Sequence, residues 1–191
     1  AGAVVFAPNY RTDLSSEQGV VDLVRDAECG YRYARTVAPD HGGDLDRPLI
    51  WVGWSLGAVF AVQAGLEESL DPTGQFLSCF AEAPRPDIIF AISGCYYEVG
   101  QPFDPEKWGN PEAQITVIAG QDDTVCPASQ SEQATEELAA RGYDVDFVML
   151  EGADHFAPVL HHSVNEEMVV APDEPAGNHV LQLITAALDG S

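Results

Sequence analysis

The sequence has very little positive charge. Of its 191 residues, 8 are Lys or Arg and 31 are Asp or Glu, and Lys107 is the single lysine. The net charge of −23 would repel nucleic acid and anionic lipid, so we expect neither as a partner. The acidic residues are scattered along the chain and do not form one tract, which is typical of an acid-rich, highly soluble surface.

Long apolar runs and metal-type cysteine spacings are also missing. No stretch approaches the roughly 18 apolar residues of a membrane span, so we expect none, and the segment Ala1–Tyr10 lacks the basic start of a signal peptide. The cysteines at positions 29, 79, 95 and 126 show neither Cys-x-x-Cys spacing nor histidine pairing. No metal site is therefore predicted. Free thiols and three disulfide pairings all remain open.

Apolar, β-branched runs alternate with segments of helical periodicity along the whole chain. We expect strands near residues 3–8, 48–53, 87–93, 114–119 and 145–150, and helices near 16–37, 56–69, 128–141 and 177–189. This alternation predicts a mostly parallel sheet flanked by helices, in a single domain over residues 1–191. The longest irregular stretch is expected at residues 156–176.

The most informative motif is Gly53-Trp54-Ser55-Leu56-Gly57, which follows the apolar run PLIWV and precedes a helix-like run. A strand, a Gly-x-Ser-x-Gly turn and a helix in this order form a nucleophile elbow, in which a sharp turn exposes the serine hydroxyl. We expect the two glycines because the strained serine backbone leaves no room for neighbouring side chains. Trp54 either lines an acyl pocket or only covers the elbow.

A serine hydroxyl needs a histidine to take its proton, and the histidine needs a carboxylate to orient it. Asp122 and Asp123 follow the strand predicted at 114–119, and His155 follows the one at 145–150. Ser55 precedes Asp123 by 68 residues, and Asp123 precedes His155 by 32. Each interval is long enough for a strand and a helix, so the three loops can meet at one edge of the sheet.

Several stretches together resemble the α/β-hydrolase superfamily, within it the carboxylesterases and lipases of the hormone-sensitive-lipase-like group. The likeness rests on VVFAPNYR (4–11), HGGDLDR (41–47), IIFAISGCYY (88–97) and GQDDTVCPASQS (120–131). Leu45 stands where these proteins usually have proline, and Cys126 where they usually have valine. We interpret the change at position 126 as a packing change.

The resemblance implies an α/β-hydrolase fold and a serine hydrolase acting on small-molecule carboxylic esters without a cofactor. Ser55 would be the nucleophile, His155 the base and Asp123, in preference to Asp122, the acid. The backbone N–H of Leu56 would be one donor of the oxyanion hole. The same triad also supports an arylformamidase or thioesterase. A third alternative is a non-catalytic fragment or subunit of a hydrolase.

In the proteins that this sequence resembles, a strand ending in the oxyanion loop lies between the NYR strand and the nucleophile strand. This sequence contains no counterpart of that strand. We therefore expect a second polypeptide to supply the missing N-terminal strands and the oxyanion loop. The alternative is that Val4–Pro8 pairs directly with Leu49–Val52 and closes the sheet.

Other residues have simpler interpretations. The His41–Asp44 segment has an oxyanion-like sequence, but its position before the nucleophile strand favours an ordinary loop. We expect exposed loop histidines at 161 and 162, a histidine near a helix start at 179, and a solvated side chain at Asp154. The acidic residues 166, 167, 173 and 174 lack the glycine-punctuated spacing of a calcium loop.

Overall fold

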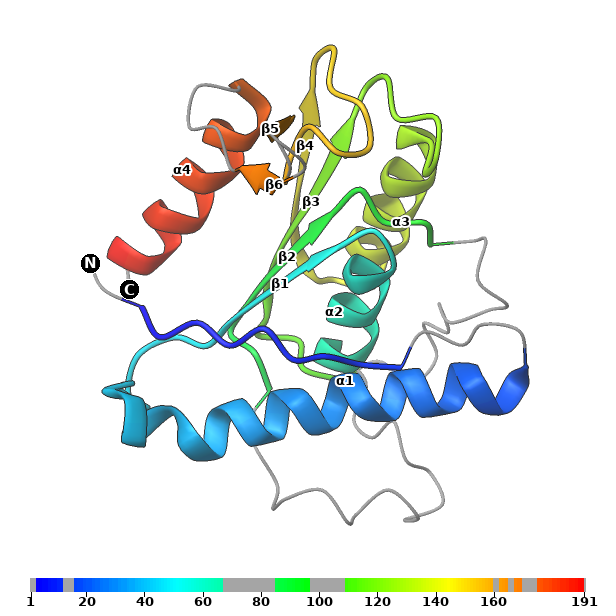
Figure 1. Cartoon of the computed structure of the whole chain (residues 1–191). Coiled ribbons are helices and arrows are strands. Elements are labelled where there is room, and N and C mark those ends of the chain that lie inside the picture. Colours follow the sequence, from blue (N-terminus) through cyan, green and yellow to red (C-terminus); the bar gives the residue numbers. More distant parts are fainter. Residues whose placement is uncertain are drawn as a thin grey trace.

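The computed structural model describes residues 3–11, 16–66, 85–96, 109–159, 162–164, 167–169 and 175–190. Its elements follow one another along the chain as shown in Figure 1. They are α1 (Glu17–Val37), the 3-10 helix η1 (Ala38–His41), β1 (Ile50–Trp54), α2 (Leu56–Leu66), β2 (Ile88–Ile92), β3 (Gln114–Gly120), α3 (Ala128–Ala140), β4 (Asp144–Leu150), β5 (His162–Val164), β6 (Glu167–Val169) and α4 (Pro175–Asp189).

The central sheet contains four parallel strands in the order β1-β2-β3-β4. The α/β class and the four strands expected after residue 40 are confirmed, with ends that differ by one or two residues. In a parallel sheet with this register, all carboxyl ends lie at one edge: Trp54 pairs with Ile92, Ile92 with Ile118, and Ile118 with Val148. The loops that follow β1, β3 and β4 therefore start close together.

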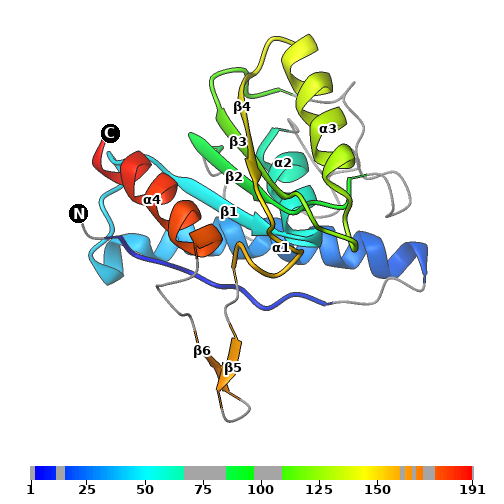
Figure 2. The ribbon, with the colours of Figure 1, turned by 90° about the horizontal axis from the view of Figure 1, so that it is seen from above.

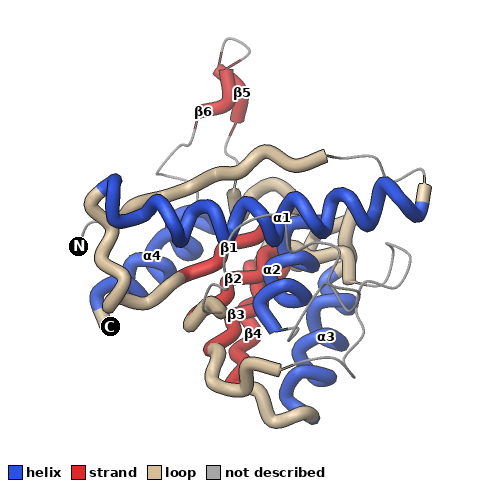
Figure 3. Tube along the Cα trace, turned by 90° about the horizontal axis from the view of Figure 1, so that it is seen from below, coloured by secondary structure: helices blue, strands red, loops and turns tan. Residues whose placement is uncertain are grey.

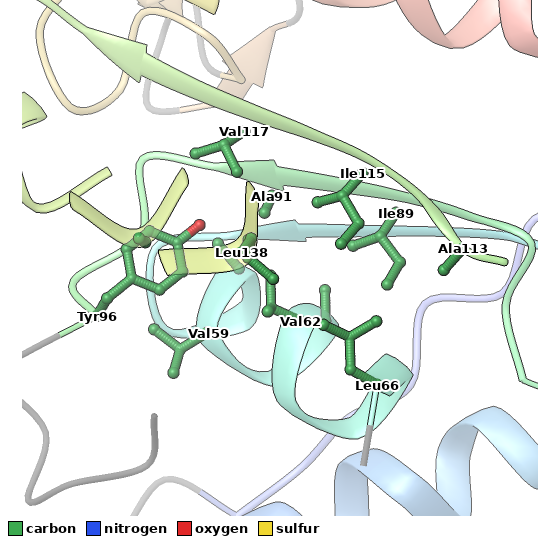
Figure 4. Close-up of a cluster of buried hydrophobic side chains, with 13 residues drawn as sticks. Val59, Val62, Leu66, Ile89, Ala91, Tyr96, Ala113, Ile115, Val117 and Leu138 are labelled. Carbon is green, nitrogen blue, oxygen red and sulfur yellow. The ribbon is translucent and has the colours of Figure 1, made fainter. Parts of the chain in front are cut away.

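Helices cover both faces of the sheet. In Figure 1, α2 and α3 lie on one side of the strands and α4 lies on the other. The α2 side holds the larger core, in which aliphatic residues of α2, β2, β3 and α3 pack together (Figure 4). Leu66, Ile89, Ile115 and Leu138 are at most 2% exposed there. Because α2 is buried on most of its surface, it reads as a continuous apolar run, as expected for the helix beneath the elbow.

Helix α1 begins where the sequence predicts. The hydroxyl of Ser16 accepts the backbone N–H of Gly19 at 3.0 Å, so it caps the first turn. One face of the helix then packs Leu23 and Ala27 against Phe60 of α2. The helix thereby lies against α2, and the ring of its Tyr31 also stacks on Trp51 of β1, with 5.0 Å between the ring centroids.

The strand predicted at residues 3–8 is wrong. Residues 3–11 belong to no strand, and they run beside α1 (Figure 3). The guanidinium of Arg11 donates to both Asp22 and Asp26, and Pro8 lies against Gly30. The hydrogen bond from Arg11 lowers the pKa of the Asp26 carboxyl. Charge pairing therefore holds residues 3–11 against α1. The hydrophobic pattern of the segment had predicted a strand in the sheet instead.

One side of β1 has no strand partner among the described residues. The residues at the two ends of β1 form hydrogen bonds with β2. The N–H of Ile88 donates to Leu49 O, and the N–H of Ser55 donates to Ile92 O. Backbone groups alternate along a strand, so those of Ile50, Val52 and Trp54 point to the other edge. Val52 is 46% exposed. No strand of the described residues pairs with this edge, and direct pairing of Val4–Pro8 with β1, the alternative named above, does not occur.

The stretch predicted to be irregular contains a short antiparallel pair, β5 and β6. Figure 2 shows this hairpin projecting away from the central sheet. Among the helices in the described part of the chain, none is both long and apolar enough to span a membrane.

Candidate active site

Ser55 occupies the sharp turn between β1 and α2. Its φ of 57° lies in the left-handed region, which a non-glycine residue adopts at a cost of about 1 to 3 kcal/mol. Two backbone hydrogen bonds hold it there: its N–H donates to Ile92 O at 2.8 Å, and its carbonyl accepts the N–H of Ala58 at 3.0 Å. The first bond extends the sheet ladder and the second starts the helix. The hydroxyl is thus presented at the carboxyl edge of the sheet.

The two glycines of the motif differ. A Cβ on Gly53 would overlap the carbonyl group of Gly57 and approach the N–H of Ala58, so glycine is required where β1 passes under the helix. A Cβ on Gly57 would meet no described atom within 4 Å. The expectation that crowding requires glycine is therefore confirmed for Gly53. For Gly57, no residue in the described part of the chain crowds the position.

His155 lies in the loop after β4 and is 3% exposed. The loop turns at Gly152, whose φ is 67°. Asp154 then accepts the N–H groups of Phe156 and Ala157 through one carboxylate oxygen, both at 2.9 Å. Asp154 is exposed, as the sequence predicts, and its side chain also forms the turn that follows His155.

Ser55, His155 and Asp123 form one hydrogen-bonded line. The Nε2 atom of His155 lies 3.1 Å from Ser55 Oγ, and its Nδ1 atom lies 2.7 Å from Asp123 Oδ2. Asp123 is 5% exposed. Asp122 instead is exposed, and its backbone N–H donates to Ala153 O at 2.9 Å. The structure thus brings together the three residues named from the sequence, with Asp123 and not Asp122 in contact with the histidine.

The Asp123 carboxylate is held at both oxygens. Oδ1 accepts the backbone N–H groups of Val125 at 2.9 Å and Cys126 at 2.7 Å, which leaves Oδ2 for His155. An ionised carboxylate can only accept, so Nδ1 of His155 carries the proton in this pair and Nε2 has its lone pair toward Ser55.

Trp54, the last residue of β1, connects this strand to the histidine loop. Its indole Nε1–H donates to the backbone carbonyl of His155 at 2.9 Å. Its ring centroid lies 5.2 Å from the ring of His155 and 5.5 Å from that of Phe156. Phe156 is 47% exposed, so it adds an accessible aromatic surface beside the histidine. The hydrogen bond to the loop is a role that neither interpretation of Trp54 from the sequence included.

The two backbone segments considered as oxyanion donors, Leu56 and His41–Asp44, differ in the availability of their N–H groups. Leu56 is the first residue of α2, where N–H groups have no acceptor within the helix. In the His41–Asp44 segment, Gly42 N–H donates to Pro39 O at 3.1 Å and Gly43 N–H to Ala38 O at 2.8 Å. Those two groups are used within their own turn. This agrees with reading the segment as an ordinary loop.

Cys126 forms a disulfide with Cys95, so the predicted packing change at this position is wrong. Cys29 is also disulfide-bonded, and Cys79 lies outside the described residues. The spacing of the cysteines carries no signal for the Cys95–Cys126 pair, because 31 residues separate them and only the parallel order of β2 and β3 brings them together.

Some of the remaining candidates lie on other elements of the fold, and others fall outside the described residues. His179 is exposed near the start of α4. His162 and Glu167 lie in β5 and β6, whereas residues 161, 166, 173 and 174 fall outside the described part of the chain. Among the described residues, no group of three or more His, Cys, Asp or Glu side chains could hold a metal ion.

The fold has clear relatives among solved structures. The esterase PE8 shares 21% identity over 92% of this chain and 68% of its own, with a TM-score of 0.54. The thermophilic esterase Est2 of the Planctomycetes species Thermogutta terrifontis shares 15% identity over 90% of this chain and 64% of its own, with a TM-score of 0.62. MGS-M1, an alpha/beta hydrolase from a Medee basin deep-sea metagenome library, shares 16% identity over 88% of this chain and 65% of its own, with a TM-score of 0.57.

These similarities show that the chain has the α/β-hydrolase fold, as the sequence predicted. The chain spans about two thirds of the length of these three structures. No family model and no curated protein sequence matches it. Membership of the hormone-sensitive-lipase-like group stays a prediction.

We expect Gly53→Ala and Gly57→Ala to differ sharply in stability. The Cβ at position 53 would force β1 and α2 apart, at a cost of about 1 to 3 kcal/mol for overpacking. The Cβ at position 57 meets open space and should change the free energy of unfolding by less than about 0.5 kcal/mol. Urea unfolding of both variants measures this, and equal losses would contradict the elbow geometry.

Proposed function

We propose that this chain carries the catalytic centre of a serine hydrolase that cleaves carboxylic esters by acyl transfer. The observation that carries the proposal is the line from Ser55 Oγ to His155 Nε2, 3.1 Å, and from His155 Nδ1 to Asp123 Oδ2, 2.7 Å. A serine hydroxyl is a weak nucleophile until an adjacent base takes its proton. Here the base is in hydrogen-bond reach and is itself oriented by a buried carboxylate.

In the acylation step, Nε2 of His155 accepts the hydroxyl proton as Ser55 Oγ attacks the ester carbonyl carbon. A tetrahedral intermediate forms, with negative charge on the former carbonyl oxygen. The imidazolium then donates its Nε2 proton to the leaving alkoxide oxygen as the carbon–oxygen bond breaks. The alcohol departs and the acyl group stays on Ser55.

Deacylation repeats the sequence with water. His155 Nε2 takes a proton from a water molecule, whose oxygen attacks the acyl carbon. The second tetrahedral intermediate collapses, Ser55 Oγ leaves and regains its proton from His155, and the carboxylic acid is released. Asp123 Oδ2 orients the imidazole in both steps and stabilises the imidazolium, while Val125 and Cys126 donate to its other oxygen.

The substrate class follows from charge and from the aromatic surface. The net charge of −23 disfavours anionic substrates. Trp54 and Phe156 provide apolar rings next to His155, and the Phe156 ring is half exposed. We therefore expect uncharged esters with an alkyl or aryl group. The same proton relay also supports cleavage of thioesters and aryl formamides, which a substrate panel separates.

Stabilisation of the oxyanion needs more than the described residues supply. The N–H of Leu56, directly after the nucleophile, is one donor at the start of α2. Removal of a single donor from an oxyanion hole typically costs about 10² to 10³ in rate. We therefore infer that a second donor reaches the site from polypeptide other than the described residues.

We propose that this donor arrives with an additional parallel strand beside β1. The open edge formed by Ile50, Val52 and Trp54 offers N–H and C=O groups to such a strand. Gly57 has open space where another backbone could approach closely. Each of the three compared structures also has about a third of its length with no counterpart here. The strand and its glycine-rich turn would come from a second polypeptide or a longer form of this chain.

The first functional prediction concerns the nucleophile. A fluorophosphonate should label Ser55 and no other serine, and Ser55→Ala should abolish turnover of p-nitrophenyl esters while far-UV circular dichroism stays unchanged. The control is Ser93→Ala, which removes a buried hydroxyl at the end of β2. Labelling of Ser93 with Ser55 unmodified would overturn the assignment. Absence of any labelling in the complete protein would favour a non-catalytic subunit.

The second concerns the neighbouring aspartates. Asp123→Asn replaces the accepting oxygen with a group that cannot hold the same imidazole tautomer, and we expect kcat to fall by about 10⁴. Asp122→Asn changes an exposed side chain and should lower kcat less than about tenfold. Steady-state kinetics with one p-nitrophenyl ester compares the two, and the reverse ranking would contradict the proposed acid.

The third concerns the open edge of β1. Val52→Pro removes an N–H that points away from β2, so the fold should survive, whereas an added strand could no longer pair there. Val52→Ala keeps this N–H and is the matched control. We expect ester hydrolysis to be lost only in Val52→Pro, and native mass spectrometry to find the active species heavier than 20.5 kDa. Full activity of a lone 20.5 kDa chain, unchanged by Val52→Pro, would refute the added strand.

A further inference from the structure

The Cys95–Cys126 disulfide joins the loops that follow two neighbouring strands. Cys95 comes three residues after β2 ends, and Cys126 lies between β3 and α3. The two Cα atoms are 4.8 Å apart. Cys126 is fully buried and Cys95 is half-buried. The link therefore crosses the carboxyl edge of the sheet, where Ser55, Asp123 and His155 meet.

Cys126 is also a direct hydrogen-bond partner of Asp123. Its backbone N–H donates to Asp123 Oδ1 at 2.7 Å, and Val125 N–H donates to the same oxygen at 2.9 Å. The other oxygen, Oδ2, faces His155 Nδ1 at 2.7 Å. The position of the Cys126 backbone therefore helps to decide where Oδ2 lies. A shift of this backbone would rotate or move the carboxylate away from the histidine.

The Cys95 end of the link is anchored in the core. The N–H of Ser93 donates to Ile118 O at 2.7 Å, which fixes the start of this loop to β3. Tyr96, directly after Cys95, is fully buried in the main core, and its ring lies against Gly94. Cys95 thus sits between two fixed points on the central part of the sheet.

The Cys126 end belongs to a more exposed segment. Asp122, Thr124, Val125 and Pro127 are exposed, with Val125 at 49%. In this turn the backbone N–H of Asp123 donates locally to Gly120 O at 3.3 Å, and that of Asp122 donates to Ala153 O at 2.9 Å. The disulfide is therefore the covalent tie between an exposed turn and the core, at the residue that contacts Asp123.

We propose that the Cys95–Cys126 disulfide is a positioning element that holds Asp123 against His155, so that hydrolysis depends on the oxidation state of this pair. The dependence of turnover rests on the proposed function; the dependence of the His155–Asp123 contact does not. Reduction by a dithiol breaks the sulfur–sulfur bond with two electrons and two protons, leaves two thiols, and converts the dithiol to its own disulfide. The half-buried Cys95 gives the reductant access.

Loss of the disulfide should lower the rate of catalysis but leave the fold largely unchanged. β2 and β3 stay paired through five residues, from Ile88 with Gln114 to Ile92 with Ile118, whether or not the loops are joined. A displacement of about 1 Å in a catalytic group can cost about 10² in rate. Because the disulfide acts through Asp123, kcat should fall while KM stays nearly constant.

The test compares wild type, wild type with dithiothreitol, and the double variant Cys95→Ala/Cys126→Val, whose valine fills the buried position without a crosslink. We expect the reduced protein and the double variant to lose about 10² in kcat on a p-nitrophenyl ester, with KM nearly unchanged, and dithiothreitol to have no further effect on the variant. Cys29→Ala removes the other described half-cystine. This variant should have the kcat of the wild type, and its kcat should fall on reduction as that of the wild type does.

A second measurement is independent of turnover. The proton between His155 Nδ1 and Asp123 Oδ2 is expected as a far-downfield ¹H NMR signal in the oxidised protein, and also in Ser55→Ala. It should weaken or shift on reduction and in the double variant. An unchanged signal and unchanged kcat after verified reduction would overturn the proposal. If no form hydrolyses esters, the NMR signal alone still decides whether the disulfide positions Asp123, and the failure then belongs to the proposed function.

Discussion

The candidate site depends on the parallel register of β1 to β4. Ser55, Asp123 and His155 lie in loops that follow three of these strands, and they meet because all strands end at one edge. The backbone of β2, between them, also contributes, since Ile92 O receives the N–H of Ser55. A shift of one residue in any strand would turn its side chains to the other face and separate the three groups.

Each of the three side chains is positioned by backbone contacts of its own loop. The strained turn at Ser55 is held by bonds to β2 and α2, and the Asp123 carboxylate by two N–H groups. The histidine loop is shaped by Asp154 and held to β1 by the indole of Trp54. Preorganisation of this kind lets a proton relay act without rearrangement during the reaction. The disulfide adds a covalent tie to the loop of the acid.

The proposed ester hydrolysis needs both proton transfer and stabilisation of an oxyanion. The described residues provide the groups for proton transfer more completely than the donors for an oxyanion. The line of hydrogen bonds from Ser55 through His155 to Asp123 is complete within the described residues, and it joins the loops after β1, β4 and β3. The donors for an oxyanion would lie near the side of β1 where no described strand pairs and no described residue crowds Gly57. An added strand would serve both needs, since it would pair the free edge and bring a backbone donor to the nucleophile.

The sequence by itself determined the fold class and the order of the functional residues, because hydrophobic periodicity and turn residues are local signals. The elbow around Ser55 and the loops carrying Asp123 and His155 could all be read in this way. The sequence did not determine where the segment 3–11 packs. Its apolar residues suit a strand, whereas Arg11 forms ion pairs with Asp22 and Asp26 on α1. Only the tertiary structure decided the Cys95–Cys126 link, the bond from Trp54 to the histidine loop and the free edge of β1. Those contacts join residues far apart in the chain, and their geometry follows from strand order and register rather than from any local pattern.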